Sequence, residues 1–199
     1  MQINIDYTTE EISQEKWQSI PYYEGIYEAS SLGRIRTCQN KTTYTQRHGA
    51  RHWKQRILKI KYCKAIKSPN RYDGRVELWK EGVHKTHLVA RLVISSFNKT
   101  YDLFDKKITV NHIDGNSLNN RISNLEWCTR KENIQKGFRQ GLYSGCKKVK
   151  VINKKTGEET IHYSLEDAGK FMGFKHGYLS TKICREKNNE NSNFYWEII

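Results

Sequence analysis

The sequence lacks several features on which large classes of protein depend. Its five cysteines are odd in number, far apart and free of any Cys-x-x-Cys pair, so the sequence predicts neither a disulfide framework nor a structural zinc site. This cysteine usage is typical of the reducing cytosol. No apolar run is long enough to span a membrane, and the first residues are polar and acidic, unlike a signal peptide. We therefore expect a cytoplasmic protein with no membrane partner.

Acidic residues are also scarce relative to basic ones. The chain has 21 Asp and Glu against 35 Lys and Arg, which gives a net charge of +14 over 199 residues. This surplus indicates a polyanionic partner, although a basic protein without such a partner is the plainer alternative. Five Trp and twelve Tyr are enough to anchor small cores, which argues against simple disorder. The length allows one to three small modules rather than one large core.

The segment 111–133, NHIDGNSLNNRISNLEWCTRKEN, carries the clearest pattern in the chain. An apolar run at 108–110 precedes it, and a second run at 125–128 follows a turn-rich loop, which is the pattern of two short strands. Thr129 and Glu132 then fit a capping box that starts a helix. The sequence therefore predicts one small unit in which a hairpin leads directly into a helix.

This order of elements resembles a ββα-metal nuclease, in which a hairpin and a helix together hold one divalent cation. The segment resembles the HNH family, and specifically the phage homing endonucleases that carry NHIDGN…NN…NLEW…EN. The resemblance implies that His112 is the general base and that Asn111 and Asn133 are protein ligands of Mg²⁺ or Mn²⁺. It also implies that Asn124 is the asparagine that orients the histidine.

Phosphodiester hydrolysis explains why these residue types are needed. A hard cation with oxygen ligands stabilises charge on the phosphate and the leaving oxygen. A neutral histidine deprotonates water, because its ordinary pKa lies near working pH. The amide of Asn111 binds Mg²⁺ more weakly than a carboxylate does, and Asp114 is an alternative donor, although Asp-Gly-Asn at 114–116 is also turn chemistry. The neighbouring asparagines are predicted to form the loop rather than to act in catalysis: Asn116, Asn119 and Asn120.

Residues 1–37 are predicted to form a small amino-terminal β-hairpin motif that binds DNA. Strand-like runs at 27–29 and 34–36 flank a Ser-Ser-Leu-Gly turn. The combination of a Trp, a Gly-x-Tyr and a Ser-x-x-Gly-Arg hairpin resembles the amino-terminal motif of phage homing endonucleases. Arg34 and Arg36 alternate onto one strand face, where they either face DNA or form a solvated surface. Three aromatic residues are predicted as core rather than as DNA-stacking groups: Trp17, Tyr22 and Tyr27.

Two further segments complete the first two-thirds of the chain. Residues 38–72 are predicted as a basic linker, which either contacts the DNA backbone or is a solvated loop. Residues 73–146 are predicted as the nuclease domain, which starts with a hairpin of strands at 75–80 and 83–87. An amphipathic helix is predicted over 88–97 because its apolar residues recur at helical spacing.

Residues 147–199 are predicted as a carboxy-terminal DNA-binding module. Its predicted elements are a hairpin, a helix with Ser164 as N-cap, a second helix and a closing strand: 149–152 with 160–163, then 165–172, 176–185 and 194–198. Two helices joined by a short turn that contains glycine indicate a helix-turn-helix. The module resembles the carboxy-terminal DNA-binding repeat of these endonucleases, although a two-helix packing unit with no DNA role is the alternative. On that resemblance, seven residues are candidates for DNA contact: Lys175, His176, Tyr178, Ser180, Thr181, Lys182 and Arg185.

The sequence therefore predicts an α+β, modular protein. A ββα-metal HNH nuclease core is flanked by a small β-rich amino-terminal motif and by a carboxy-terminal hairpin with a helix-turn-helix. The predicted function is a site-specific, metal-dependent endonuclease of homing or mobile-element type, which nicks one strand of double-stranded DNA as a monomer without an obligate protein partner. The resemblance implies a bacteriophage source and action in the cytoplasm of the host bacterium. An HNH-derived DNA-binding regulator that does not cut is the alternative, and RNA binding is less favoured because no RNA-module signature is present.

Overall fold

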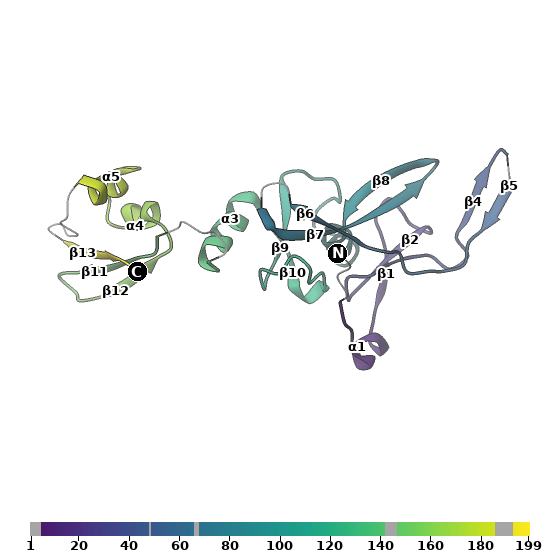
Figure 1. Cartoon of the computed structure of the whole chain (residues 1–199), viewed down its shortest axis with the longest axis horizontal. Helices are drawn as coiled ribbons and strands as arrows, with labels where there is room; N and C mark the ends of the chain where they lie inside the picture. The colour runs from purple at the N-terminus through teal and green to yellow at the C-terminus, as the bar shows by residue number, and fades with distance from the viewer. Residues whose placement is uncertain (1–4, 48, 66–67, 142–146, 186–192) are drawn as a thin grey trace. The chain divides into compact units, whose positions relative to one another are not determined.

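The computed structural model of the chain divides into two compact units, Met1–Asn133 and Ile134–Ile199 (Figure 1). The structure describes residues 5–47, 49–65, 68–141, 147–185 and 193–199. Within these residues no helix is long and apolar enough to cross a membrane. Among the described residues, Cys38, Cys63 and Cys128 form no disulfide, and Cys146 lies outside the described part of the chain. The mixture of short helices and small sheets confirms the predicted α+β class.

The amino-terminal motif is a three-stranded antiparallel sheet of order β1-β2-β3. Its strands are β1 (Trp17–Ser19), β2 (Tyr27–Ser30) and β3 (Ile35–Thr37), so the predicted hairpin is confirmed and gains a third strand. A short helix, α1 (Thr9–Ser13), precedes it and was not predicted. A capping box between Thr8 and Glu11 starts this helix.

Two of the three aromatic predictions in this motif need correction. Tyr27 is buried as expected, at 3% exposure, but Tyr22 is 46% exposed and has a φ of +68°. The neighbouring Tyr23 fills the core instead, because the turn that Tyr22 occupies directs its side chain outward. Trp17 is half-buried beneath the guanidinium of Arg36, whose central carbon lies 4.0 Å from the ring centroid.

The segment predicted as a basic linker contains regular strands. They are β4 (Thr42–Thr45), β5 (Gly49–His52), β6 (Lys61–Ala65) and the first part of β7 (Ser68–Lys80). Strands β4 and β5 form a hairpin, and β6 pairs with β7. Backbone hydrogen bonds also tie the segment to β3, from Thr37 N–H to Arg56 O (3.0 Å) and from Leu58 N–H to Ile35 O (2.8 Å). The basic side chains therefore project from ordered backbone rather than from a free loop.

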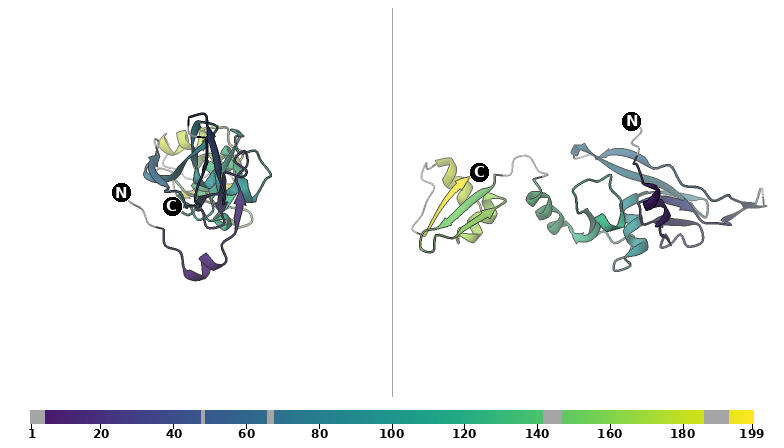
Figure 2. Two further views of the ribbon diagram at one scale, coloured as in Figure 1. Left: turned by 90° about the vertical axis from the view of Figure 1, so that its right-hand side faces the viewer. Right: turned by 90° about the horizontal axis from the view of Figure 1, so that it is seen from below.

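The elements of the predicted nuclease domain follow the predicted order. Strand β7 pairs with β8 (Val83–Leu88), and α2 (Val89–Phe97) follows at once. The hairpin of β9 (Ile108–His112) and β10 (Leu125–Thr129) then leads through the chain into α3 (Arg130–Arg139) (Figures 1 and 2). The predicted capping box is present, since Thr129 N–H donates to Glu132 Oε2 (2.8 Å) and Glu132 N–H donates to Thr129 Oγ1 (3.2 Å).

The amino-terminal sheet and the nuclease elements share one hydrophobic core. Helix α2 supplies its centre, where Val89, Leu92, Val93 and Ile94 are almost completely buried, as its helical spacing predicted. Leu88, by contrast, is 40% exposed because it precedes the helix as its N-cap. Residues from both segments contribute to this core: Ile20, Tyr23, Tyr27, Ala29, Ile35, Val76, Leu78 and Leu125.

The carboxy-terminal unit has its own sheet and core. Strands β11 (Val149–Asn153), β12 (Glu159–His162) and β13 (Phe194–Ile198) form an antiparallel sheet of order β12-β11-β13. Helices α4 (Leu165–Phe171) and α5 (Tyr178–Arg185) cover one face of it (Figure 1). The predicted hairpin, two helices and closing strand are all present. Six buried residues form the core: Val149, Val151, Ala168, Met172, Leu179 and Trp196.

Candidate active site

The β9–β10 hairpin places the predicted catalytic residues at the end of a strand. In its register His112 lies opposite Leu125 and Asn111 lies opposite Glu126. Successive side chains of a strand point to opposite faces, so the side chains of Asn111 and His112 lie in two different environments although the residues are neighbours. Both are buried, at 7% and 8% exposure. Buried polar groups of this kind need hydrogen-bond partners, and those partners define the site.

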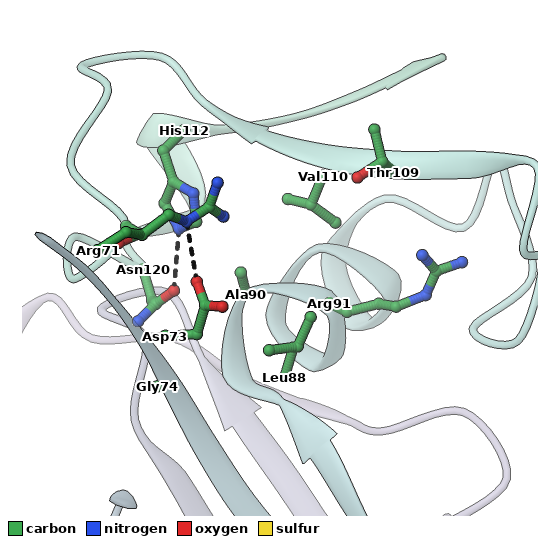
Figure 3. A pocket seen from close by; sticks show the side chains of 11 residues that line it. Arg71, Asp73, Gly74, Leu88, Ala90, Arg91, Thr109, Val110, His112 and Asn120 are labelled. Atoms are coloured by element: carbon green, nitrogen blue, oxygen red, sulfur yellow. Dashed lines mark hydrogen bonds and ion pairs between the residues drawn. The ribbon is translucent and has the colours of Figure 1, made fainter. Parts of the chain in front are cut away.

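His112 lines a cavity of about 80 Å³ between β9, β7 and α2 (Figure 3). Its Nε2 lies 3.2 Å from Oδ1 of Asn120, which is itself only 4% exposed. Because an amide oxygen only accepts hydrogen bonds, this contact requires the proton to be on Nε2. The Nδ1 lone pair is then the basic atom of the imidazole.

The surroundings of His112 favour the neutral imidazole. Burial lowers its pKa below the ordinary value for histidine, and the guanidinium of Arg71 lowers it further. The contact with Asn120 and the carboxylates of Asp114 and Asp73 act in the opposite direction but do not reverse the shift. A histidine with a lowered pKa holds a free lone pair at neutral pH, as a general base must.

Asn124, predicted to orient His112, contacts the active-site loop instead. Its Oδ1 accepts from the backbone N–H of Asp114 (3.0 Å), and its Nδ2 donates to Asp114 Oδ1 (2.9 Å) and to Asn119 O (2.8 Å). The side chain that contacts the imidazole directly is Asn120, which was predicted only as a loop former. Asn124 therefore holds the loop at Asp114 and Asn119, and its role toward His112 stays a prediction.

Asp114 forms the turn, as its Asp-Gly-Asn sequence predicted. Its Oδ1 accepts from the backbone N–H of Asn116 (2.8 Å), and its Oδ2 accepts from Asn119 Nδ2 (2.7 Å). Burial alone would raise the pKa of this carboxyl, but the hydrogen bonds from Asn119, Asn116 and Asn124 hold the pKa below its ordinary value. The carboxylate is thus committed to the loop, which leaves it poorly suited to replace Asn111 as a metal ligand.

The predicted metal ligands are two amides with a carboxylate nearby. Asn111 Nδ2 donates to Glu126 Oε1 (2.7 Å), which leaves Asn111 Oδ1 as the oxygen that can face a cation. Asn133 lies half-buried in the first turn of α3, the helix that the Thr129–Glu132 box starts. The described residues contain no group of three or more His, Cys, Asp or Glu side chains that could hold a metal. Amide and carboxylate oxygens fit a hard, partly hydrated cation such as Mg²⁺ or Mn²⁺.

The amino-terminal DNA-contact candidates are both engaged in ion pairs. Arg34 Nε donates to Glu15 Oε1 (2.8 Å), and a second contact joins the same two side chains through Arg34 Nη2. Arg36 Nε donates to Glu28 Oε2 (2.7 Å). Both guanidiniums are at least three-quarters buried as side chains. A DNA phosphate would have to compete with these carboxylates for either arginine.

The carboxy-terminal candidates are mostly exposed. Lys175, His176, Tyr178, Ser180 and Thr181 are all exposed, while Leu179 between them is buried. The Ser180 and Thr181 hydroxyls donate to the backbone oxygen of Gly177, at 2.8 and 3.0 Å.

The remaining two candidates differ in what the structure describes. Lys182 is half-buried, with Nζ 5.5 Å from the Trp196 ring centroid. The side chain of Arg185 lies outside the described residues. Ser164 caps α4 by accepting from Asp167 N–H (3.1 Å), as its position before the helix predicted.

Sequence reasoning missed two residues of the site. Asn120 gave no signal beyond its place in an Asn-Asn pair, and its burial depends on chain segments far away in the sequence. Arg71 lies at the end of a basic run, and nothing in the sequence pattern distinguishes it from the other Lys and Arg residues of that run. In the structure its guanidinium lies beside the His112 ring, with Nε donating to Asp73 Oδ1 (3.0 Å) (Figure 3).

Comparisons with known proteins match both halves of the first unit. Residues 15–68 match the NUMOD4 motif, and residues 104–135 match the HNH endonuclease family. The chain is 29% identical over 174 residues to DNA endonuclease I-HmuI of Bacillus phage SP01, covering 86% of this chain and 82% of that protein. It is also 29% identical over 189 residues to an uncharacterized HNH endonuclease of Acanthamoeba polyphaga mimivirus, covering 92% of this chain but about half (48%) of that protein.

One solved structure, of DNA binding and cleavage by the HNH homing endonuclease I-HmuI, aligns with a TM-score of 0.44 and 25% identity. The alignment covers 92% of this chain and 98% of that one. The NHIDGN…NLEW…EN pattern falls within the matched HNH segment, and the Ser-x-x-Gly-Arg hairpin falls within the matched NUMOD4 segment. The chain therefore carries a segment that matches the NUMOD4 motif ahead of a segment that matches the HNH endonuclease family, and most of its length is similar to that of the HNH homing endonuclease I-HmuI.

Proposed function

We propose that the protein hydrolyses a phosphodiester of double-stranded DNA at a specific site, with His112 as general base. The observation that carries this proposal is the buried imidazole of His112, whose Nε2 lies 3.2 Å from Asn120 Oδ1 and whose pKa is lowered by burial. With the proton fixed on Nε2, Nδ1 takes a proton from water as the water attacks phosphorus. General-base catalysis of this kind contributes about a hundredfold to ten-thousandfold in rate.

Asn111 and Asn133 are proposed to hold one divalent cation, Mg²⁺ or Mn²⁺. When bound, the cation supplies positive charge to the phosphate and the leaving oxygen. Glu126 supports the proposal because its Oε1 accepts from Asn111 Nδ2, so the amide nitrogen is occupied and Oδ1 is the atom proposed to bind the cation. The hard-oxygen character of these groups favours Mg²⁺ or Mn²⁺ over zinc.

Arg71 is proposed to contact the phosphate that is cleaved. Its guanidinium lies beside His112, and its side chain is 51% exposed, so a phosphate can reach it. Asp73 accepts one hydrogen bond from Arg71 Nε, which fixes the orientation of the guanidinium. The terminal N–H groups of the guanidinium remain available to an anion. Burial lowers the pKa of His112, and the Arg71 guanidinium lowers this pKa further, so the same side chain is proposed both to bind the phosphate and to favour the neutral imidazole.

Site recognition is proposed to come from the two ends of the chain. The exposed residues before and on α5 are proposed to contact DNA as a helix-turn-helix does, together with Lys182 and Arg185. In the amino-terminal motif, Arg34 and Arg36 are proposed to contact DNA phosphates in place of their present partners, Glu15 and Glu28. The absence of disulfides at Cys38, Cys63 and Cys128 is compatible with action in a reducing host cytoplasm.

One protein molecule is proposed to act as a monomer that nicks one strand. A single set of His and Asn residues handles one phosphodiester at a time. The recognition elements do not repeat along the chain, so nothing indicates a palindromic target, which usually mirrors a two-fold dimer. Supercoiled plasmid with the target should convert first to nicked circles, at a rate linear in enzyme concentration. Immediate linear product with second-order dependence on enzyme would show that a dimer acts.

The experiment that tests the function is cleavage of a random DNA library in Mg²⁺ or Mn²⁺, followed by sequencing of the ends. We expect ends that cluster at one asymmetric site and that disappear when the metal is chelated. Protein that enriches a sequence by binding but produces no ends in either metal would identify a regulator rather than a nuclease.

A further inference from the structure

We infer that the turn of the NUMOD4 motif is a positioning element of the active site, which holds Asn120 and through it His112. This inference rests on the proposed function, because it assigns the purpose of the Asn120–His112 contact to catalysis. It concerns the turn at Ser30–Arg34, between β2 and β3, and the loop at 113–124, between β9 and β10. About ninety residues of sequence separate the two.

The turn meets the loop at Gly33. This glycine has a φ of +88°, and a Cβ atom on it would lie 2.8 Å from both Cβ and O of Asn120 and 2.9 Å from its carbonyl carbon. These distances are shorter than van der Waals contact, and two of the three atoms are backbone, which does not yield as a flexible side chain would. The Gly of the Ser-x-x-Gly-Arg hairpin is therefore needed for its conformation and also for the close approach of Asn120.

A backbone hydrogen bond fixes the same junction. The N–H of Ile122 donates to Ser31 O at 2.9 Å, so the loop is bonded to the turn two residues beyond Asn120. On the other side, a Cβ on Gly74 of β7 would lie 3.4 Å from Asn120 Nδ2. Asn120 is thus held between the turn and β7, with its Oδ1 directed at His112 Nε2.

The turn is rigid enough to serve as a support. Ser30 is completely buried, and its Oγ accepts from the backbone N–H groups of Leu32 (3.2 Å) and Arg34 (2.9 Å). Ser31 also exchanges hydrogen bonds with Lys16, from Ser31 N–H to Lys16 O (2.8 Å) and from Lys16 N–H to Ser31 Oγ (3.0 Å). Ser30 and Ser31 therefore tie the turn to backbone groups on both sides of it.

A second contact joins α1 to the loop beside Asn120. Arg121 Nη2 donates to Glu11 Oε1 (2.9 Å) and Arg121 Nε donates to the same oxygen (3.1 Å). The Arg121 guanidinium also lies over the ring of Tyr7, 5.3 Å from its centroid. The pair is partly exposed, so its contribution is smaller than that of the buried junction. The amino-terminal segment therefore contacts the 113–124 loop at two places, at and beside Asn120, the partner of His112.

The test compares two glycines of the same motif. Gly33 and Gly25 both have positive φ, +88° and +73°, but a Cβ on Gly25 would meet no atom within 4 Å. Gly33→Ala and Gly25→Ala therefore introduce the same kind of backbone strain, and only Gly33→Ala displaces Asn120. We expect Gly33→Ala to lower kcat at saturating DNA and metal by about a hundredfold, since small misplacements of catalytic groups cost on that order. Its DNA affinity should stay within about threefold of that of Gly25→Ala, because the altered contact points to the loop rather than to DNA.

A second readout does not depend on cleavage. The ¹⁵N spectrum of the His112 imidazole in wild type and Gly25→Ala should show the proton on Nε2, and Gly33→Ala should lose that preference. If the wild type does not cut DNA, the proposed function fails, and this spectrum still decides the inference. A Gly33→Ala protein with the kcat and the imidazole spectrum of Gly25→Ala would overturn it.

The exposed pair provides a variant that does not disturb packing, in case Gly33→Ala does not fold. Glu11→Ala removes the partner of Arg121 and also breaks the capping box with Thr8, while Thr8→Ala breaks the same box and leaves Glu11 to Arg121. We expect Glu11→Ala to lower kcat about threefold relative to Thr8→Ala, with faster hydrogen exchange at the Ile122 amide. Equal kcat and equal exchange in the two variants would contradict the inference.

Discussion

The loop around His112 and the region of α5 both contain polar side chains, but three asparagines around His112 are buried and most side chains near α5 are exposed. Around His112, the side chains of Asn111, Asn120 and Asn124 are all at least nine-tenths buried, and each makes a specific hydrogen bond. On the α5 side, Lys175, His176, Tyr178, Ser180 and Thr181 are exposed. Catalysis requires groups fixed before the substrate arrives, whereas recognition of DNA tolerates side chains that settle on binding. The difference predicts that changes at the loop affect the chemical step and changes on α5 affect the choice of site.

The strongest way to separate the two regions is to remove the metal. Chelation should stop cleavage completely while DNA binding continues, because the cation acts on the phosphate and the basic side chains act on the backbone. Cleavage that persists in excess chelator would rule out the metal mechanism.

The proposed role of Asn111 as a metal ligand is tested by Asn111→Asp. This change should lower the Mn²⁺ concentration needed for a half-maximal cleavage rate, because a carboxylate binds a hard cation better than an amide does. Asn116→Asp adds the same charge to the same loop, at a residue whose side chain only bonds its own turn, and should leave the metal requirement unchanged. An Asn111→Asp protein with the wild-type requirement would mean that Asn111 is not a ligand.

The recognition side is tested by deletion of residues 147–199. The first unit keeps its own core and should still bind and cut DNA, but its preference for the target over random sequence should fall about tenfold or more. Binding should still weaken steeply with salt, because many basic residues remain.

Point variants sharpen this result. If Lys175 contacts a phosphate, Lys175→Ala should reduce the slope of the logarithm of DNA affinity against the logarithm of salt concentration by about one unit. Lys155→Ala, in the turn after β11, should leave that slope unchanged. Full target preference in the truncated protein would assign sequence reading to the first unit.

The same contrast explains which parts of the protein the sequence predicts. The β9–β10 hairpin, the Thr129–Glu132 box and the Ser164 cap depend on residues within a few positions of each other, so local patterns reveal them. Asn120 was assigned only to the loop because its partners, Gly33 and Gly74, are 87 and 46 residues away.

Two more errors lie in the amino-terminal motif. The Glu15 partner of Arg34 was missed because pattern reading sees the basic strand face but not the carboxylate that folds onto it. Tyr22 was predicted as core, but its positive φ places it in a turn, and Tyr23 takes the buried position. The Arg34 case depends on a contact 19 residues away, and the Tyr22 case depends on a turn conformation, and neither can be read from composition or spacing.

The pH dependence of cleavage is expected to show a smaller effect. The general base must be neutral, so activity is lost as pH falls through the pKa of His112, and the lowered pKa extends full activity below the ordinary histidine range near 6.5. Arg71→Gln removes a cation that lowers this pKa, so the acid limb of the rate profile should move to higher pH. Lys85→Gln removes a charge that lowers the pKa of His87 rather than of His112, and should leave the limb in place. Identical acid limbs in the two variants would contradict the assignment of Arg71.

The central claim, that His112 is the general base of a nuclease, is tested most directly by single-turnover cleavage with wild type and His112→Ala. Target DNA should be saturated with enzyme in Mg²⁺, and DNA affinity should be measured in parallel. The account predicts that the variant binds DNA with affinity within about threefold of wild type and cuts about a hundredfold to ten-thousandfold more slowly. A variant that cuts at the wild-type rate would contradict it.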